Sequence, residues 1–229
     1  MKTISVIMPV FNTQKYIAEA IGSLLAQNYP KLEIIVIDDG STDNSASIAE
    51  QMGATVIRQS NAGVAAARNR GLEAATGELI TFLDADDLWT DDHLYWQTKA
   101  LTQHPDLTYV TSYVQRFHTD GLRASYVLET FLPSLGAAMA KYDLFERIGL
   151  FDESLRQGED LDWFLRLRDS QEVFALIPEA LLKYRTHQTN ITANKTEVQT
   201  WKFAALRKRF KRFAGHPPPL RDIPILELS

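Results

Sequence analysis

The sequence of 229 residues contains no cysteine. This absence excludes a disulfide framework and any thiolate-bound zinc or iron–sulfur site, and it fits a reducing compartment. No stretch approaches the roughly 18 consecutive apolar residues that span a membrane. The apolar run at residues 4–11 is too short and too β-branched for a signal peptide, and Pro9 interrupts it. We therefore expect a cytoplasmic protein without membrane-spanning segments.

Several phosphate-binding and catalytic motifs are also missing. There is no Walker-type phosphate loop and no glycine-rich dinucleotide motif, which excludes the usual NTPase and dehydrogenase folds. Zinc-protease spacings and a serine nucleophile elbow are absent as well. A calcium loop beginning at Asp84 would need glycine at its sixth position and glutamate at its twelfth, where Trp89 and Tyr95 stand.

Charge is present but unevenly distributed. The net charge is −5, yet residues 201–213 contain six basic side chains and no acid. The rest of the chain is therefore strongly acidic, which argues against a nucleic-acid partner. With 45% hydrophobic and 23% charged residues, the composition is that of an ordinary globular protein.

Strand-like and helix-like segments alternate through the first half of the chain. The apolar runs typical of buried parallel strands are residues 4–10, 32–38, 55–58 and 79–83. The helical patterns between them are residues 15–27, 45–52 and 64–75. This alternation predicts an α/β fold with a doubly wound, mostly parallel sheet and helices on both faces.

The pattern is less regular in the second half. We expect further helices at residues 91–104, 142–148 and 160–168. We expect strands at residues 107–113, 173–177 and 181–184, with a strand and a loop over 114–136.

Three carboxylates follow the strand at residues 79–83, namely Asp84, Asp86 and Asp87. Open α/β sheets bind ligands at the carboxyl ends of their strands. Like charges about 4 Å apart repel by roughly 4 kcal/mol at an effective dielectric constant near 20. A cation between Asp84 and Asp86 would relieve this repulsion, and an all-oxygen site suits Mg²⁺ or Mn²⁺.

Other candidate residues allow two interpretations each. Asp39 follows directly after the strand at 32–38. Helix capping explains the segment from Ser41 to Ser45 but not the adjacent acids Asp38 and Asp39. A carboxylate at this place can instead accept a hydrogen bond from a ribose or a base. Arg68 can reach a phosphate or carboxylate, or form a surface salt bridge. The acids at 159–160 either cap a helix or supply a general base of raised pKa.

These motifs, taken in order, resemble the inverting glycosyltransferases of family 2, which have the GT-A fold. The resemblance covers roughly residues 3–190. The segments that carry it are residues 5–12, 35–43, 63–69, 82–87, 151–153 and 158–160.

The resemblance implies a role for each matching position on the donor side. Asp39 would bind the donor nucleoside, and Pro9 and Phe11 would line the same pocket. Asp84 and Asp86 match the D-x-D pair, which would bind the donor through Mn²⁺ or Mg²⁺. The donor-binding and metal-binding sets are completed by Arg68 and, on a less specific match, by His187.

Asp160 would be the general base, with Glu159 beside it. The resemblance then implies an in-line displacement in which an acceptor hydroxyl attacks the anomeric carbon and inverts its configuration. The donor would be a nucleoside-diphosphate sugar, most commonly a UDP-sugar in this family, and the acceptor a saccharide or a lipid-linked molecule. Residues 1–113 would bind the donor, residues 114–190 would hold the base and the acceptor, and residues 191–229 would form an extension.

The chain lacks the Q-x-x-R-W motif of processive synthases, so we expect non-processive transfer, in polysaccharide or glycolipid biosynthesis. Two other functions stay open. A sugar-nucleotide pyrophosphorylase would need a glycine-rich loop ending in a basic residue, which residues 10–13 do not provide. An inactive nucleotide-sugar-binding module would not need the complete set of acids.

The basic segment 201–213 has the spacing of an amphipathic helix, with Phe203, Leu206, Phe210 and Phe213 on one face. We expect this apolar face to pack on the domain or on a second subunit, leaving the basic face solvated. The alternative is peripheral contact with an anionic membrane on its inner face.

Overall fold

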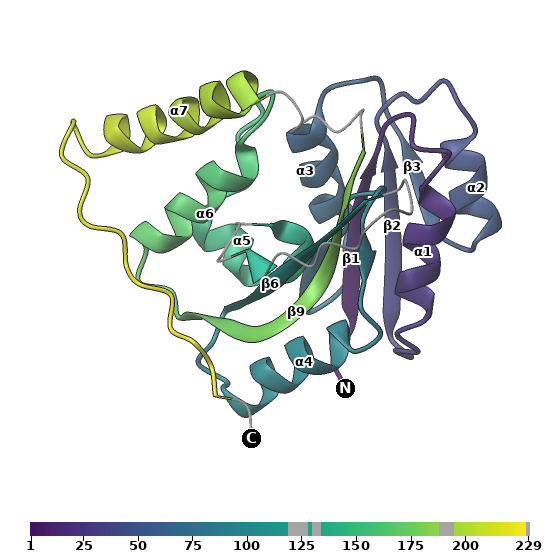
Figure 1. Ribbon diagram of the computed structural model, residues 1–229, viewed down its shortest axis with the longest axis horizontal. Coiled ribbons are helices and arrows are strands. Elements are labelled where there is room, and N and C mark those ends of the chain that lie inside the picture. The colour runs from purple at the N-terminus through teal and green to yellow at the C-terminus, as the bar shows by residue number, and fades with distance from the viewer. Residues whose placement is uncertain (119–127, 130–133, 188–194, 228–229) are drawn as a thin grey trace.

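The structure is a computed structural model that describes residues 1–118, 128–129, 134–187 and 195–227. Its strands are β1 (Ile4–Val10), β2 (Leu32–Asp38), β3 (Thr55–Arg58), β4 (Leu79–Phe82), β5 (Leu88–Trp89), β6 (Tyr109–His118), β7 (Leu128–Glu129), β8 (Ala138–Lys141) and β9 (Phe174–Thr186). They form one curled sheet in the order β3-β2-β1-β4-β8-β6-β9-β5, and β7 pairs with β6 outside this order (Figure 1). The predicted α/β class and mostly parallel sheet are confirmed.

Helices cover both faces of this sheet. They are α1 (Ile17–Leu25), α2 (Ser45–Gln51), α3 (Val64–Ala74), α4 (His93–Gln103), α5 (Asp143–Ile148), α6 (Glu159–Asp169) and α7 (Lys195–Arg212), and a short 3-10 helix spans Leu135–Ala137. Alternate residues of β1 explain the arrangement, since Val6 and Met8 pack with α1 and α4 while Ile7 packs against α3. Gly71 lets α3 approach closely, because a Cβ there would overlap the side chain of Ile7.

The second half of the sheet differs from the sequence prediction in three places. β5, which pairs antiparallel with β9, was not predicted. β8 was not predicted; it lies antiparallel between β4 and β6. The two short strands expected at 173–177 and 181–184 are one strand, β9. Pro178 does not break it, because the pairing with β6 steps from Ile177 to Ala180 and leaves Pro178 in a bulge that needs no ladder hydrogen bond.

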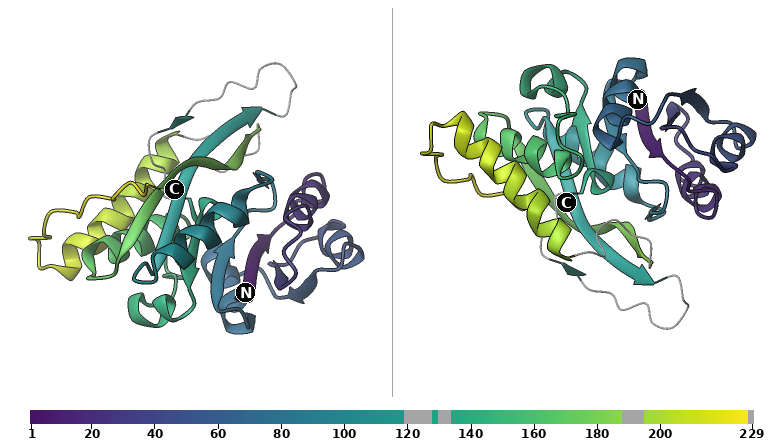
Figure 2. Two further views of the ribbon diagram at one scale, coloured as in Figure 1. Left: turned by 90° about the horizontal axis from the view of Figure 1, so that it is seen from below. Right: turned by 90° about the horizontal axis from the view of Figure 1, so that it is seen from above.

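The predicted basic helix exists as α7. Of the arrangements expected for its apolar face, packing on the domain is wrong, whereas contact with a second subunit or a membrane stays a prediction. Phe203 is 69% exposed and Phe210 is 48% exposed, so the aromatic face does not pack on the domain. The opposite face packs instead, through the buried Ala205 and through ion pairs of Lys208, Arg209 and Arg212 with Asp152, Asp169 and Asp162. After α7 the chain returns to the sheet, where Leu226 donates a backbone hydrogen bond to Leu176. Figure 2 shows α7 lying beside α6.

Candidate active site

The carboxyl ends of β1, β2 and β4 meet at one edge of the sheet, at the top of Figure 1. Asn12, in the left-handed region with φ 54°, ties the first two loops together. Its backbone N–H donates to Ser41 Oγ at 2.9 Å, and its Oδ1 accepts from the Thr42 N–H at 2.8 Å. Pro9 is half-buried and Phe11 is exposed at this edge. Hydrogen bonds thus join the loops at this edge, which carry the residues predicted to line a nucleoside pocket.

Asp39 is buried, and its carboxylate organises the loop before α3. Oδ1 accepts from Gln59 Nε2 and from the Ala62 N–H, both at 2.8 Å, and Oδ2 accepts from the Gly63 N–H at 2.9 Å. The N–H groups at the start of α3 provide a favourable partial positive charge. Each carboxylate oxygen can accept two hydrogen bonds, so Oδ2 keeps one acceptor position beyond those filled by described residues.

The acids after β4 are close together and differ in exposure. The side chain of Asp84 is 44% exposed and that of Asp86 is 28% exposed. Burial and the charge of Asp84 raise the pKa of Asp86 above its ordinary value. Asp87 is buried, and burial together with the charges of Asp86 and Asp84 raises its pKa further. The like-charge cluster expected from the sequence therefore forms.

The end of β9 borders this cluster. His187 Nε2 lies 3.0 Å from Asp86 Oδ2, and its ring stacks on Tyr16 with the centroids 4.8 Å apart. Arg185 donates its backbone N–H to Asp87 Oδ1 at 2.8 Å and its Nε to the Asp86 carbonyl at 2.6 Å. The structure thus brings His187 to the D-x-D pair. Arg185 and Asp87 hold the end of β9 against the loop that carries Asp86. This contact was not predicted, and the only hint of it in the sequence is that Arg185 comes two residues before His187.

Arg68 joins the two sides of the site. The buried guanidinium donates from Nη2 to Asp84 Oδ1 at 2.8 Å and from Nη1 to Glu159 at the start of α6. Burial lowers the pKa of Arg68, but the charges of Asp84 and Glu159 outweigh that effect and raise it, so the group stays charged. The surface salt bridge considered from the sequence is therefore the wrong alternative; Arg68 is a buried bridge between two carboxylates.

Glu159 and Asp160 begin α6, directly after Gly158, whose φ of 81° requires the conformational freedom of glycine. Burial raises the pKa of Glu159 to about 7, helped by the charges of Asp160 and Asp84 and opposed by Arg68. Asp160 is half-buried and accepts the Leu161 N–H on Oδ1 at 2.6 Å. Burial and the charge of Asp84 raise its pKa, and Arg68 opposes this. Asp160 is thus the more accessible of the two acids.

The side chains at the end of β4 offer oxygen ligands that suit a divalent cation. Within the described parts of the chain, no three His, Asp or Glu side chains gather closely enough to hold a metal ion by themselves. The carboxylate oxygens of Asp84 and Asp86 nevertheless suit a hard cation such as Mg²⁺ or Mn²⁺, which commonly takes its other ligands from phosphates and water. The residues present fit a metal that is shared with a phosphorylated ligand.

No helix in the described ranges is both long and apolar enough to cross a membrane.

Comparison with known proteins identifies relatives for most of the chain. The family model described as "Glycosyl transferase family 2" matches residues 5–152. An uncharacterized glycosyltransferase of Rickettsia typhi is 33% identical over 219 residues, covering 85% of this chain and 68% of the relative. A second relative, from Rickettsia conorii, is 34% identical over 173 residues but is covered over only 28% of its length. The uncharacterized glycosyltransferase EpsJ of Bacillus subtilis is 32% identical over 215 residues and is covered over 62% of its length.

Solved structures match the whole architecture at lower sequence identity. A fragment of S. aureus TarS in complex with UDP-GlcNAc superposes with a TM-score of 0.74 at 21% identity, covering 91% of this chain and 66% of that one. The mannosyltransferase PcManGT from Pyrobaculum calidifontis matches with a TM-score of 0.72 at 23% identity, covering 95% and 66%. These similarities show the fold, which is that of the GT-A glycosyltransferases. Together with the family match, they establish that the chain belongs to the family-2 glycosyl transferases.

Proposed function

We propose that the chain transfers a sugar from a nucleoside-diphosphate sugar to an acceptor hydroxyl, with inversion at the anomeric carbon and with a divalent metal bound. One observation carries the proposal. Arg68 contacts both Asp84, at the end of the D-x-D strand, and Glu159, beside Asp160. The buried guanidinium of Arg68 therefore fixes the distance between the donor side and the proposed base side of the site. An in-line displacement requires such fixed positions of its reacting groups.

Asp160 is proposed as the general base that takes the proton from the acceptor hydroxyl. It is the more exposed of the two acids at the start of α6, and its pKa is raised, which favours proton transfer near neutral pH. Glu159 is buried against Arg68 and is better suited to position the helix than to exchange a proton with an acceptor. A positioned base contributes roughly 10²–10⁴-fold in rate.

Asp84 and Asp86 are proposed to hold the metal, with His187 beside them. A bound Mn²⁺ or Mg²⁺ would supply charge neutralisation to the leaving diphosphate. His187 contacts the carboxylate of Asp86 and restricts how it can turn, while Arg185 holds the backbone carbonyl of the same residue. Asp39 is proposed to bind the nucleoside through its remaining acceptor position, in a pocket lined by Pro9 and Phe11.

The donor and acceptor are proposed by class. The matching TarS structure contains UDP-GlcNAc, and the matching PcManGT structure contains GDP-Man with Mn²⁺. UDP-sugars are therefore the first donors to test and GDP-mannose the second. The acceptor is a saccharide or a lipid-linked molecule, in polysaccharide or glycolipid synthesis at the cytoplasmic side of a membrane. The acidic body of the protein does not favour a nucleic acid.

The test is a donor panel followed by release of nucleoside diphosphate, with Mn²⁺, with Mg²⁺ and with a chelator. We expect metal-dependent turnover of one nucleotide class, and the anomeric configuration of the product, measured by NMR, to be opposite to that of the donor. Turnover that survives complete chelation would contradict the metal assignment. Retention of configuration would contradict the single displacement. Failure of every donor to stabilise or react with the protein would count against the donor assignment as a whole.

A further inference from the structure

The outer face of α7 carries a stripe of large apolar side chains. Phe203, Leu206 and Phe210 are 69%, 36% and 48% exposed, respectively. Their spacing of three and four residues places them side by side along the helix. We call this surface the outer stripe. Contiguous exposed apolar groups of this size mark interaction sites more often than single exposed residues do.

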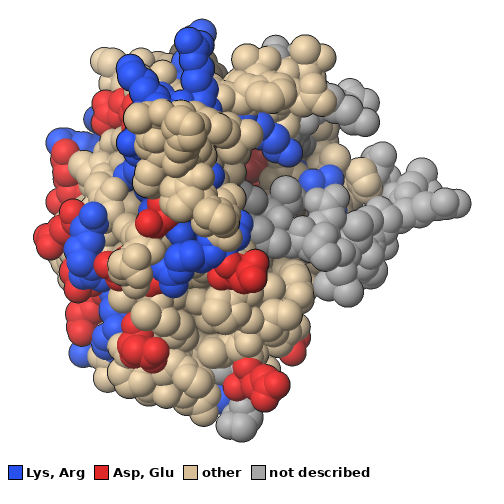
Figure 3. Space-filling model, turned by 90° about the vertical axis from the view of Figure 1, so that its left-hand side faces the viewer, with Lys and Arg blue, Asp and Glu red and all other residues tan. Residues whose placement is uncertain are grey.

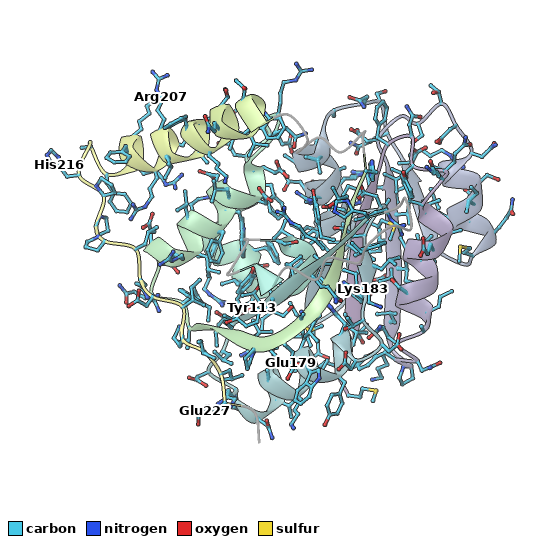
Figure 4. The ribbon with its side chains drawn as sticks, viewed as in Figure 1. Tyr113, Glu179, Lys183, Arg207, His216 and Glu227 are labelled. Carbon is cyan, nitrogen blue, oxygen red and sulfur yellow. The ribbon has the colours of Figure 1, made fainter. Side chains whose placement is uncertain are left out.

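Basic side chains flank the outer stripe. Arg207 and Lys211 lie along one side of it and Lys202 along the other, and all three are exposed. None of them forms an ion pair with another described residue, whereas Lys208, Arg209 and Arg212 on the inner face are all paired with acids. Arg207 projects away from the domain in Figure 4, and basic side chains gather along the upper edge in Figure 3. The positive charge of the outer face is thus not neutralised by any described acid.

A shallow hollow adjoins the outer stripe. It has a volume of about 610 Å³ and is lined by Phe203, Arg207 and Lys211, among others. It combines an apolar wall with three cations, of which Lys208 is paired with Asp152. This is the composition that interfacial helices present to the headgroup region of a lipid bilayer.

The first turns of α7 lie beside the start of α6, where the proposed base Asp160 stands. Trp201 packs against Gly158, the residue before Glu159 and Asp160, so the first half of α7 covers the start of α6. In Figure 1, α7 lies at the edge toward which β1 and β2 run, and in the right-hand view of Figure 2 no described element lies in front of it. A flat surface that touches the outer stripe would therefore also face the edge of the sheet that carries the site.

We propose that the outer face of α7 docks the protein on an anionic lipid surface, with the active-site edge turned toward that surface. Aromatic and aliphatic side chains insert at the headgroup boundary, and each nearby Lys or Arg strengthens attachment to anionic lipids. A symmetric dimer through the same face would bring the basic residues Lys202, Arg207 and Lys211 of both copies into one interface, which like-charge repulsion opposes. A long polyanion would meet the acidic body as well as the helix, whereas a bilayer meets only this edge.

The test is co-sedimentation with phosphatidylcholine vesicles, with and without added phosphatidylglycerol, in the absence of donor and acceptor. The wild-type protein should bind the anionic vesicles and dissociate as salt is raised. Arg207→Glu/Lys211→Glu should weaken binding by more than about tenfold, because each basic residue contributes about fivefold. Phe203→Ser/Phe210→Ser should weaken binding to a similar extent at every salt concentration. All four side chains are exposed, so circular dichroism should show unchanged folding.

Tyr95→Ser/Lys99→Glu is the matched control, because it removes one exposed aromatic ring and one lysine from α4, at the opposite edge in Figure 1. It should bind anionic vesicles like the wild type. If the wild type bound neither vesicle type, or if the control lost as much affinity as the α7 variants, the proposal would be overturned. A wild-type dimer in sedimentation velocity that Phe203→Ser/Phe210→Ser dissolves, with no vesicle binding, would assign the face to a second copy instead. These outcomes are independent of the sugar-transfer proposal, since no donor is present.

Discussion

The ends of β2 and β4 have the same sequence pattern, an apolar strand that ends in adjacent or near-adjacent aspartates, yet they hold different charge environments. Asp39 after β2 accepts three hydrogen bonds, two of them from the Ala62 and Gly63 N–H groups at the start of α3. Asp84 and Asp86 after β4 lie close enough to raise the pKa of Asp86, and both are partly exposed. The difference lies in the neighbouring groups: backbone N–H groups at the start of α3 bind the Asp39 carboxylate, whereas the partly exposed Asp84 and Asp86 are bound by the side chains of Arg68 and His187. The end of β4 is therefore the place where an added cation is favoured.

The largest effect is expected at Asp160, an acid at the start of α6 that belongs to neither strand end. We expect Asp160→Asn to lower kcat by roughly 10²–10⁴-fold, because the amide cannot accept the acceptor proton. Donor binding, measured by calorimetry, should be unchanged, since the proposed metal and nucleoside contacts come from Asp84, Asp86 and Asp39 and not from Asp160. A variant that keeps wild-type kcat would remove Asp160 from the role of base, and Glu159 would become the next candidate.

Breaking the link between the two sides should lower stability more than it would at a surface ion pair. Arg68→Met leaves the buried Glu159 without its partner, and we expect the free energy of unfolding to fall by about 3–5 kcal/mol. The measurement is urea unfolding at neutral pH. Arg68→Lys should recover only part of the loss, because one ammonium group cannot bridge two carboxylates as a guanidinium does. Equal stability of Arg68→Met and the wild type would contradict the buried bridge.

The two strand ends can be compared directly by isosteric substitutions. Asp39→Asn turns an acceptor into a donor that faces backbone N–H groups, and it should destabilise the fold by about 1–3 kcal/mol. Asp86→Asn should leave the free energy of unfolding unchanged or raise it, because it relieves repulsion from Asp84 and Asp87. Thermal unfolding without ligands measures both. If Asp86→Asn destabilised the protein as much as Asp39→Asn, the proposed contrast between the strand ends would be wrong.

The smallest effect is expected at the inner face of α7. Burial raises the pKa of Asp152, but hydrogen bonds from Lys208 and Ser154 outweigh it and bring the pKa down to about 2. A lowered folded-state pKa stabilises the protein above the unfolded-state value of about 3.9 and ceases to do so as the pH falls through the folded-state value. Because the pair is largely solvated, Asp152→Asn should cost less than about 1 kcal/mol at neutral pH. Chemical unfolding at several pH values should show that this difference shrinks between about pH 4 and pH 2; a difference that grew on acidification would contradict the ion pair.

Short sequence patterns predicted the features that are set by residues close together in the chain, such as strands and the acids that follow them. The apolar runs of β1, β2 and β4 and the acids after them were located correctly, because burial and strand ends are visible in short windows. The bridge from Arg68 to Glu159 was not predictable, since it joins residues that are 91 positions apart. β8 was missed because its short segment has no alternating pattern. The expectation that the apolar face of α7 packs on the domain was wrong, because three basic residues of the helix find acidic partners on the domain instead, and sequence periodicity does not reveal such partners.

The central claim is that Asp84 and Asp86 form a cation site that binds the donor diphosphate. Isothermal titration calorimetry of UDP, and of GDP in parallel, with Mn²⁺ or with a chelator, tests this claim most directly. The account predicts that one nucleotide binds the wild-type protein with metal, that binding is lost on chelation, and that Asp86→Asn loses it in the presence of metal. Nucleotide binding of equal affinity with metal and with the chelator, unaffected by Asp86→Asn, would contradict the account.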